Sequence, residues 1–302
     1  MSSVSFRRAT PADTYTTFEI FEESLADLLK RLGHEEPTSF ADPLAMEQMW
    51  QERRPLYEHI VASGSEYWLA EMESEAVGFA RSVLRGDVLQ LTELFVKPGV
   101  QSSGAGKGLL SRAFAAAPER RRLVIASPDV RAQVLYMRAG VYPVCSVYYF
   151  YRAPRKREVS AEIEAIALDD SPDTLRILNE LDREVLSLER EIDHRWLLND
   201  RQGYLFLRRG RAVGYGYCGK RSGPFALLDP QDVPAALAFA ESDAAQRGQT
   251  HFGVEVPLLN RAAIQHLLAS GFLIEPFYAQ LLTDAAIGQL DRYIITSPPF
   301  LL

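Results

Sequence analysis

Apolar and polar positions follow the same order twice along the chain. Residues 66–82 and 203–219 each place an aromatic, apolar run before a charged turn and continue with Ala-Val-Gly and a second apolar run. Apolar runs rich in aromatic and β-branched residues on either side of a polar turn are typical of β-hairpins. The sequence therefore predicts one hairpin in each half.

The elements after the hairpins also repeat. A strand ends in "LFVKP" in the first half and in "ALLDP" in the second, and each is followed by an amphipathic helix, a buried strand and a second helix. The buried strands are predicted at 122–128 and 251–257. In the helices that follow, Asp129 aligns with Asn260. This order predicts two copies of one α/β unit.

Both copies begin with a helix-start signal, Thr or Ser before Pro. Thr10 lies 66 residues before Ala76, whereas Ser171 lies only 41 residues before Ala212. The first copy therefore contains an insert, which we place within 31–60.

The boundary between the copies is predicted at 151–160, where a proline and four basic residues interrupt both periodicities. A chain of 302 residues is long enough for two domains of ordinary size. We therefore expect domains at 1–154 and 158–302.

Composition narrows the classes of partner. The net charge of −7 gives no basic surplus for nucleic acid, and no run approaches 18 uncharged apolar residues. We expect a cytoplasmic protein, monomer or homodimer, with no nucleic-acid or membrane partner. Cys145 and Cys218 lack metal-ligand spacing and the five histidines do not cluster, so we expect reduced thiols and no metal.

A glycine-rich loop at 101–107 precedes the amphipathic helix of the first copy. Glycines let main-chain amides approach a ligand closely, and a helix N-terminus favours phosphate. A P-loop is disfavoured, because Gln101 and Gly108 stand where Gly and Ser or Thr belong. A Rossmann fingerprint is incomplete.

Together, "QSSGAG" at 101–106 and "AQVLYMRAG" at 132–140 resemble the acetyl-CoA-binding motifs of the GNAT superfamily of N-acyltransferases. The family pattern is [QR]-x-x-G-x-[GA] after a strand, then A-x-x-x-Y-x-x-x-G on a helix. The resemblance covers nearly all of 4–152 and, in the order of elements, 160–284. It implies a tandem GNAT protein of α/β class, each domain a twisted mixed, mostly antiparallel sheet flanked by helices.

The resemblance also implies how acetyl-CoA, the co-substrate, is bound. The CoA pyrophosphate would be held by main-chain amides of Gln101, Ser102, Ser103, Gly104, Ala105, Gly106 and Lys107. The pantetheine arm would pair with a strand end formed by Leu94, Phe95 and Val96, and the amide near Val96 would polarise the thioester carbonyl. Asp129 stands where the family usually has an Asn that contacts the arm.

Two residues are candidates for proton transfer. Tyr136 matches the general acid of the family, with a tyrosine on an apolar helix face as the alternative. Glu93 is the candidate base, and a solvated or ion-paired strand residue is the alternative. The implied function is an N-acetyltransferase in which a primary amine of a small molecule or peptide attacks directly in a ternary complex. A non-catalytic acyl-CoA-binding or sensing protein and an NTP-binding protein stay open.

The second copy lacks these features. Its helix after Pro230 has no preceding glycine, and Leu267 stands at the position of Tyr136. We therefore predict a degenerate second domain. Each copy ends in a single long strand, and the run 292–298 is a spare strand able to complete either sheet. Strand exchange between the copies would bury an exposed edge.

Overall fold

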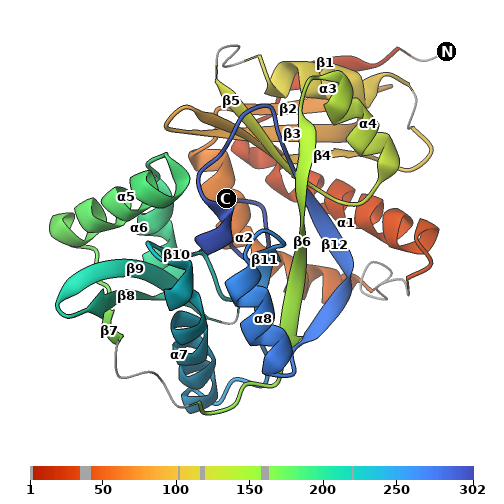
Figure 1. The fold of residues 1–302 in the computed structure, drawn as a ribbon. Coiled ribbons are helices and arrows are strands. Elements are labelled where there is room, and N and C mark those ends of the chain that lie inside the picture. Colours follow the sequence, from red (N-terminus) through yellow and green to blue (C-terminus); the bar gives the residue numbers. More distant parts are fainter. Residues whose placement is uncertain (1–2, 35–41, 101–102, 116–119, 158–162, 220) are drawn as a thin grey trace. The chain divides into compact units, whose positions relative to one another are not determined.

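The computed structural model describes the chain except for residues 1–2, 35–41, 101–102, 116–119, 158–162 and 220 (Figure 1). The chain divides into two compact units. The first consists of Met1–Leu84, Leu89–Arg122 and Asp129–Ala139, and the second of Arg85–Val88, Leu123–Pro128 and Gly140–Leu302. These units are not the two sequence copies, so the domain bounds 1–154 and 158–302 stay a prediction about the repeat.

The first unit contains the strand order β1-β2-β3-β4 and helices that follow β1, β4 and β5 in the chain. Its elements are β1 (Ser5–Arg8), η1 (Pro11–Asp13), α1 (Thr14–Arg31), α2 (Pro43–Ala62), β2 (Glu66–Met72), β3 (Glu75–Arg85), β4 (Val88–Val96), α3 (Ala105–Ala113) and α4 (Val130–Arg138). The 20 residues of α2 fall within or next to the predicted insert.

The second unit contains two groups of paired strands, ordered β5-β12-β6-β11 and β13-β10-β9-β8-β7. Its strands are β5 (Arg121–Ala126, from Leu123 onward), β6 (Tyr142–Arg152), β7 (Glu164–Ala167), β8 (Gln202–Arg208), β9 (Arg211–Cys218), β10 (Phe225–Leu227), β11 (Phe252–Pro257), β12 (Leu273–Thr283) and β13 (Tyr293–Ile294). Its helices are α5 (Pro172–Leu186), α6 (Glu191–Asp200), η3 (Pro230–Asp232), α7 (Val233–Gln246), α8 (Arg261–Ala269) and η4 (Leu290–Arg292).

The predicted hairpins are confirmed as β2–β3 and β8–β9, and both contain a register shift near the turn. Close packing explains why each Ala-Val-Gly repeat has a glycine. A Cβ at Gly78 would lie 2.8 Å from the main-chain oxygen of Phe95, and one at Gly214 would lie 2.4 Å from that of Ala226. The repeated glycine therefore lets the next strand approach closely.

Strand exchange between the sequence copies is confirmed within the second unit. The last strand of the first copy, β6, pairs antiparallel with β11 of the second. The last strand of the second copy, β12, pairs with Leu123–Ala126 of β5 and with β6, alongside which it runs in Figure 1. Each copy therefore gives its long strand to the other, which provides hydrogen-bond partners for otherwise open edges.

The predicted spare strand has a different role from this exchange. Residues Tyr293–Ile294 form β13, which pairs antiparallel with β10. The next residue, Ile295, forms an antiparallel bridge to Glu255 of β11. The segment therefore lies between β10 and β11 of the second copy and completes that copy's sheet.

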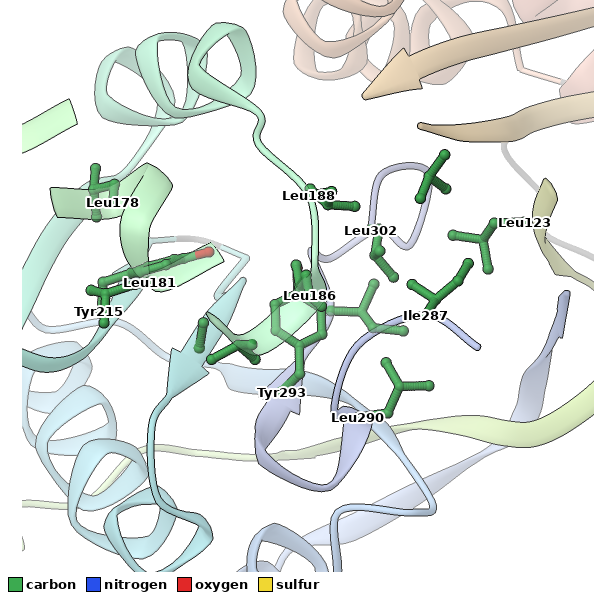
Figure 2. Packing of buried hydrophobic residues seen from close by; sticks show 14 of the residues in the cluster. Leu123, Leu178, Leu181, Leu186, Leu188, Tyr215, Ile287, Leu290, Tyr293 and Leu302 are labelled. Carbon is green, nitrogen blue, oxygen red and sulfur yellow. The ribbon is translucent and has the colours of Figure 1, made fainter. Parts of the chain in front are cut away.

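Two hydrophobic cores cover the two faces of the five-stranded sheet β13-β10-β9-β8-β7. Neighbouring residues Phe225 and Ala226 belong to different cores, as the alternation of side chains along a strand requires. Figure 2 shows leucines of α5 gathered in one core with Tyr293 and Leu302. Burying each large apolar side chain contributes roughly 1.5–3 kcal/mol, so this core anchors the segment that carries β13.

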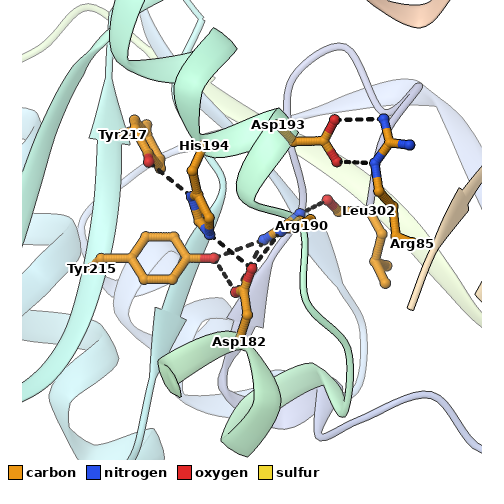
Figure 3. A network of polar contacts seen from close by, with 8 residues as sticks. All are labelled: Arg85, Asp182, Arg190, Asp193, His194, Tyr215, Tyr217 and Leu302. Carbon is orange, nitrogen blue, oxygen red and sulfur yellow. Dashed lines mark hydrogen bonds and ion pairs between the residues drawn. The ribbon is translucent and has the colours of Figure 1, made fainter. Parts of the chain in front are cut away.

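A buried polar network joins α5, α6 and β9 (Figure 3). Asp182 accepts hydrogen bonds from Arg190 at 2.7 Å and from the hydroxyl of Tyr215, and its Oδ2 lies 2.9 Å from Nε2 of His194. Arg190 also donates to the main-chain oxygen of Leu302. Attraction to Arg190 and His194 outweighs the effect of burial and lowers the pKa of Asp182 to about 2.

Candidate active site

The N-cap residue of α3 has no side chain, and the hydroxyl of Ser103 just before it accepts a hydrogen bond from the amide of Ala105 at 3.3 Å. Gly104 is the N-cap residue and has a φ of 92°, in the left-handed region that glycine adopts readily. The first intrahelical bond runs from the amide of Gly108 to the oxygen of Gly104, at 3.0 Å. The amides of 105–107 therefore precede the helical ladder, where a helix presents its donors to anions.

The other glycines of α3 differ in how close an added side chain would come to its neighbours. A Cβ at Gly106 would make only ordinary contact with Leu135, at 3.6 Å, whereas one at Gly108 would lie 2.2 Å from the ring of Phe6. A side chain at 108 would therefore displace the ring of Phe6 from α3, although the sequence context of Gly108 marked it only as a failed P-loop position. Gln101 and Ser102 lie outside the described residues.

The end of β4 carries the residues predicted to flank the pantetheine arm, and all three are half-buried. Phe95 packs against Phe21 of α1, with ring centroids 4.8 Å apart, and stacks on Phe79 at 5.8 Å. Just beyond the strand, the amide of Lys97 donates to the oxygen of Val77 at 2.8 Å. These contacts fix the last residues of β4 against β3 and α1.

Tyr136 lies on α4 with only 4% of its surface exposed. Burial, and to a smaller extent the negative charge of Asp129, raises the pKa of its phenol above the usual value. The hydroxyl therefore keeps its proton at neutral pH, which is the state that a proton donor requires.

Asp129 is used by the chain itself. Its carboxylate caps α4 by accepting from the amide of Arg131 at 2.9 Å, and it forms ion pairs with the side chains of Arg131 and Arg31. These hydrogen bonds outweigh partial burial and lower the pKa of Asp129. The departure from the family's Asn is thus accompanied by two cations that keep the carboxylate ionised.

Glu93 forms a buried ion pair with Arg81, and the two side chains expose 0% and 1% of their surfaces. The guanidinium of Arg81 also lies 4.6 Å from the ring centroid of Tyr57 and 5.3 Å from that of Tyr67. Burial raises the pKa of Glu93, and Arg81 opposes the shift. The ion-paired alternative is therefore present in the structure, and a role as a base stays a prediction.

The corresponding positions of the second copy are occupied by the chain's own atoms. Asp229 caps the start of η3 by accepting from the amide of Gln231 at 2.8 Å, so a carboxylate stands at this N-terminus. Asn260 accepts from the amide of Ala263 at 3.0 Å and donates to the oxygen of Tyr293 at 3.1 Å. A carboxylate would repel an anion there, which is consistent with the predicted loss of the phosphate loop; that the second copy binds no CoA stays a prediction.

Two features are absent from the part of the chain that the structure describes. Within it, no group of three or more His, Cys, Asp or Glu side chains is arranged to hold a metal ion. No helix there combines the length and the apolar character needed to cross a membrane.

Part of the sequence matches the model of a known family. Residues 27–141 match the family model described as "Acetyltransferase (GNAT) family". No curated protein matches the sequence.

Solved structures match almost the whole chain. A candidate acetyltransferase from Pyrococcus horikoshii is 16% identical, with a TM-score of 0.72 over 97% of this chain and 94% of that one. A GCN5-related N-acetyltransferase from Sphaerobacter thermophilus is also 16% identical, with a TM-score of 0.62 over 93% and 95%. A tandem GNAT protein from the clavulanic acid biosynthesis pathway is 14% identical, with a TM-score of 0.56 over 94% and 98%.

These findings establish the fold. The chain has a tandem GNAT fold, and its residues 27–141 match the model of a family of acetyltransferases. The predicted mixed α/β fold is confirmed.

Proposed function

We propose that the GNAT domain at 27–141 makes this protein an acetyl-CoA-dependent N-acetyltransferase. It acetylates a primary amine of a small molecule or peptide by direct attack in a ternary complex. The observation that carries the proposal is the start of α3, where Gly104 is the N-cap and the neighbouring acceptor is the neutral hydroxyl of Ser103. The same place in the second copy is filled by the carboxylate of Asp229.

The residues present fit CoA as a ligand. The amides at the start of α3 and the partial positive charge of the helix suit a diphosphate. Within the chain, the amide of Ser103 donates to the oxygen of Val100 and that of Ala105 to the hydroxyl of Ser103, both at 3.3 Å, so a bound diphosphate would compete for these two donors. Acetyl-CoA supplies an activated acyl group as a thioester. The end of β4 at Leu94–Val96 is assigned to the pantetheine arm, and the amide near Val96 to the developing negative charge on the thioester oxygen.

The reaction forms a C–N bond and breaks the C–S bond. The amine must first lose the proton of its ammonium form, and the leaving thiolate must gain one. Tyr136 is assigned to the second step, supported by its position on α4 and by a pKa that keeps it protonated. Glu93 is the assigned base, and reaching the amine would require its pair with Arg81 to open or a water to relay the proton.

The test combines a binding measurement with a thiol-release assay over several amine classes. We expect calorimetric binding of CoA and acetyl-CoA, release of free thiol with at least one amine class, and no binding of ATP. The variant Tyr136→Phe is expected to lower kcat by about 10- to 1,000-fold with little change in CoA affinity. Tyr142→Phe, at an exposed tyrosine of β6, is the matched control.

The alternative, a non-catalytic acyl-CoA-binding protein, gives a different pattern. It would bind CoA, release no thiol with any amine class and respond to Tyr136→Phe with no measurable change. Failure to bind CoA at all would reject both readings.

A further inference from the structure

The second unit contains a pocket of about 660 Å³ that none of the assigned steps uses. It is formed by β6, β11, β12, the turn at 248–251 and residues of the segment after β13. Its walls include Tyr149, His251, Glu255, Glu275, Phe277 and Tyr278. A volume of this size suits a small-molecule ligand, for which pockets of about 300–1,000 Å³ are usual.

Two irregular features of the sequence create the hollow. Between Ile274 and Tyr278 the pairing of β12 with β6 shifts register, so that 275–277 stand opposite the single residue Tyr149. Pro276, in the middle of this stretch, has no amide proton to donate to the ladder. On the other side, a Cβ at Gly253 would lie 2.3 Å from the ring of Tyr149, so glycine there lets the ring lie against β11.

Aromatic rings surround the pocket. The hydroxyl of Tyr149 lies 2.8 Å from Nε2 of His251, and the two rings are stacked with centroids 5.9 Å apart. Tyr278 stacks on Tyr148 at 5.1 Å. Rings held by such contacts lose little freedom when a ligand binds, and their faces attract cations.

The charges in the pocket also favour a cation. Among the described residues that line it, the carboxylates of Glu255 and Glu275 stand against one guanidinium, that of Arg221. Glu255 accepts from the hydroxyl of Ser297 at a long 3.4 Å. Burial raises the pKa of Glu255 to about 7, and the charge of Arg221 only partly opposes this shift. A carboxylate that is costly to ionise in the empty pocket is stabilised when a cation binds beside it.

We propose that this pocket binds a small molecule that carries an ammonium group on an apolar body, with the ammonium beside Glu255 and the body among Tyr149, Phe277 and Tyr278. The inference does not depend on the proposed acetyl transfer. It rests on the pocket's shape, its rings and its excess of carboxylates.

The test uses three probes that share a phenyl ring and differ in charge. Phenethylammonium carries the positive charge, 2-phenylethanol is its neutral counterpart, and phenylacetate carries a negative charge. Calorimetry on the full chain at pH 7 is expected to show saturable, one-to-one binding of phenethylammonium. We expect the other two probes to bind at least about tenfold more weakly, since one lost charge-assisted contact is worth this much.

Variants locate the binding site. Glu255→Gln keeps the shape and removes the charge, so it is expected to weaken phenethylammonium binding at least about tenfold. Glu164→Gln, at an exposed glutamate of β7, is the matched control and is expected to change nothing. Circular dichroism checks that both variants are folded, and Tyr149→Phe provides a second, milder test, since it leaves the ring in place and removes the contact with His251.

Three outcomes would overturn the proposal. One is the absence of phenethylammonium binding up to 10 mM, a limit of about −3 kcal/mol. Another is equal affinity in the wild type and in folded Glu255→Gln. The third is tighter binding of phenylacetate than of phenethylammonium, which would assign the pocket to an anion held by Arg221.

Discussion

Asn260 donates a hydrogen bond to the main-chain oxygen of Tyr293, at 3.1 Å, from the position that aligns with Asp129 in the first copy. Tyr293 begins β13, which lies between β10 and β11. The second copy thus uses this asparagine to bind its own chain. We expect that CoA binding, as proposed above, belongs to the first copy alone, and the first two predictions test this.

Gly104→Val is expected to lower CoA affinity at least tenfold. A β-branched residue at a φ of 92° costs about 1–3 kcal/mol, and relieving that strain moves the amides at the start of α3. Calorimetry with CoA measures the effect. Gly210→Val is the control, because Gly210 has a φ of 74° and equally open surroundings in a turn of the second unit. Equal losses in both variants would point to general destabilisation.

Asp229→Ala is expected to leave CoA affinity unchanged. Loss of its cap to the amide of Gln231 should lower the free energy of unfolding by about 1 kcal/mol. Denaturant unfolding and CoA titration of the same sample test both halves of the prediction. If CoA affinity falls while the first unit stays folded, the binding site would instead lie in the second copy.

Glu93→Gln is expected to destabilise the protein by about 3 kcal/mol or more, because it leaves the buried guanidinium of Arg81 without its counter-charge. The double variant Arg81→Met with Glu93→Leu removes both charges and should recover much of this loss. If Glu93 also transfers a proton, the double variant regains stability but not kcat. Recovery of both would leave Glu93 with a purely structural role.

Asp182→Asn is expected to cost about 3 kcal/mol or more at pH 7, because Arg190 is then buried without its carboxylate. The pKa of Asp182 is lowered from 3.8 to about 2 in the folded state. The resulting stabilisation is complete above pH 4 and is lost as the pH falls through 2. Urea unfolding between pH 2 and 7 should show this loss in the wild type and a flatter profile in the variant.

Glu255→Gln is expected to raise the free energy of unfolding relative to the wild type, and to raise it more at pH 8 than at pH 5. The pKa of Glu255 is raised from 4.5 to about 7, so its contribution favours the folded state below pH 4.5 and disappears as the pH rises through 7. The difference amounts to about 3 kcal/mol at most. Arg221, Glu275, Tyr149 and His251 line the same pocket in both proteins. Parallel stability profiles in the two proteins would contradict the assigned pKa.

Local patterns were enough to predict much of this fold. The two hairpins, the helices at 105–113 and 130–138 and the single long last strands follow from periodicity and turn residues. The helix start at Ser171 is confirmed, with the amide of Thr174 donating to its hydroxyl at 3.3 Å. These features depend on neighbours in the sequence, so the sequence alone displays them.

The candidate site was predictable only in part. The left-handed conformation of Gly104 follows from a glycine before a helix, and the start of α3 lies where the motif places it. The ion pair of Glu93 with Arg81 was open, because the partner depends on which face of β4 points into the interior. The need for glycine at 108 arises from Phe6, about a hundred residues earlier.

The sequence by itself determined the repeated α/β units, the loss of the phosphate loop in the second copy and the presence of one long terminal strand in each. Only the tertiary structure decided that β6 pairs with β11, that β12 pairs with β5, and that β13 lies between β10 and β11. Strand pairing is made by main-chain groups that every residue except proline carries, so composition does not identify the partner. Which edge is open, and which strand reaches it, is fixed only when the whole chain has packed.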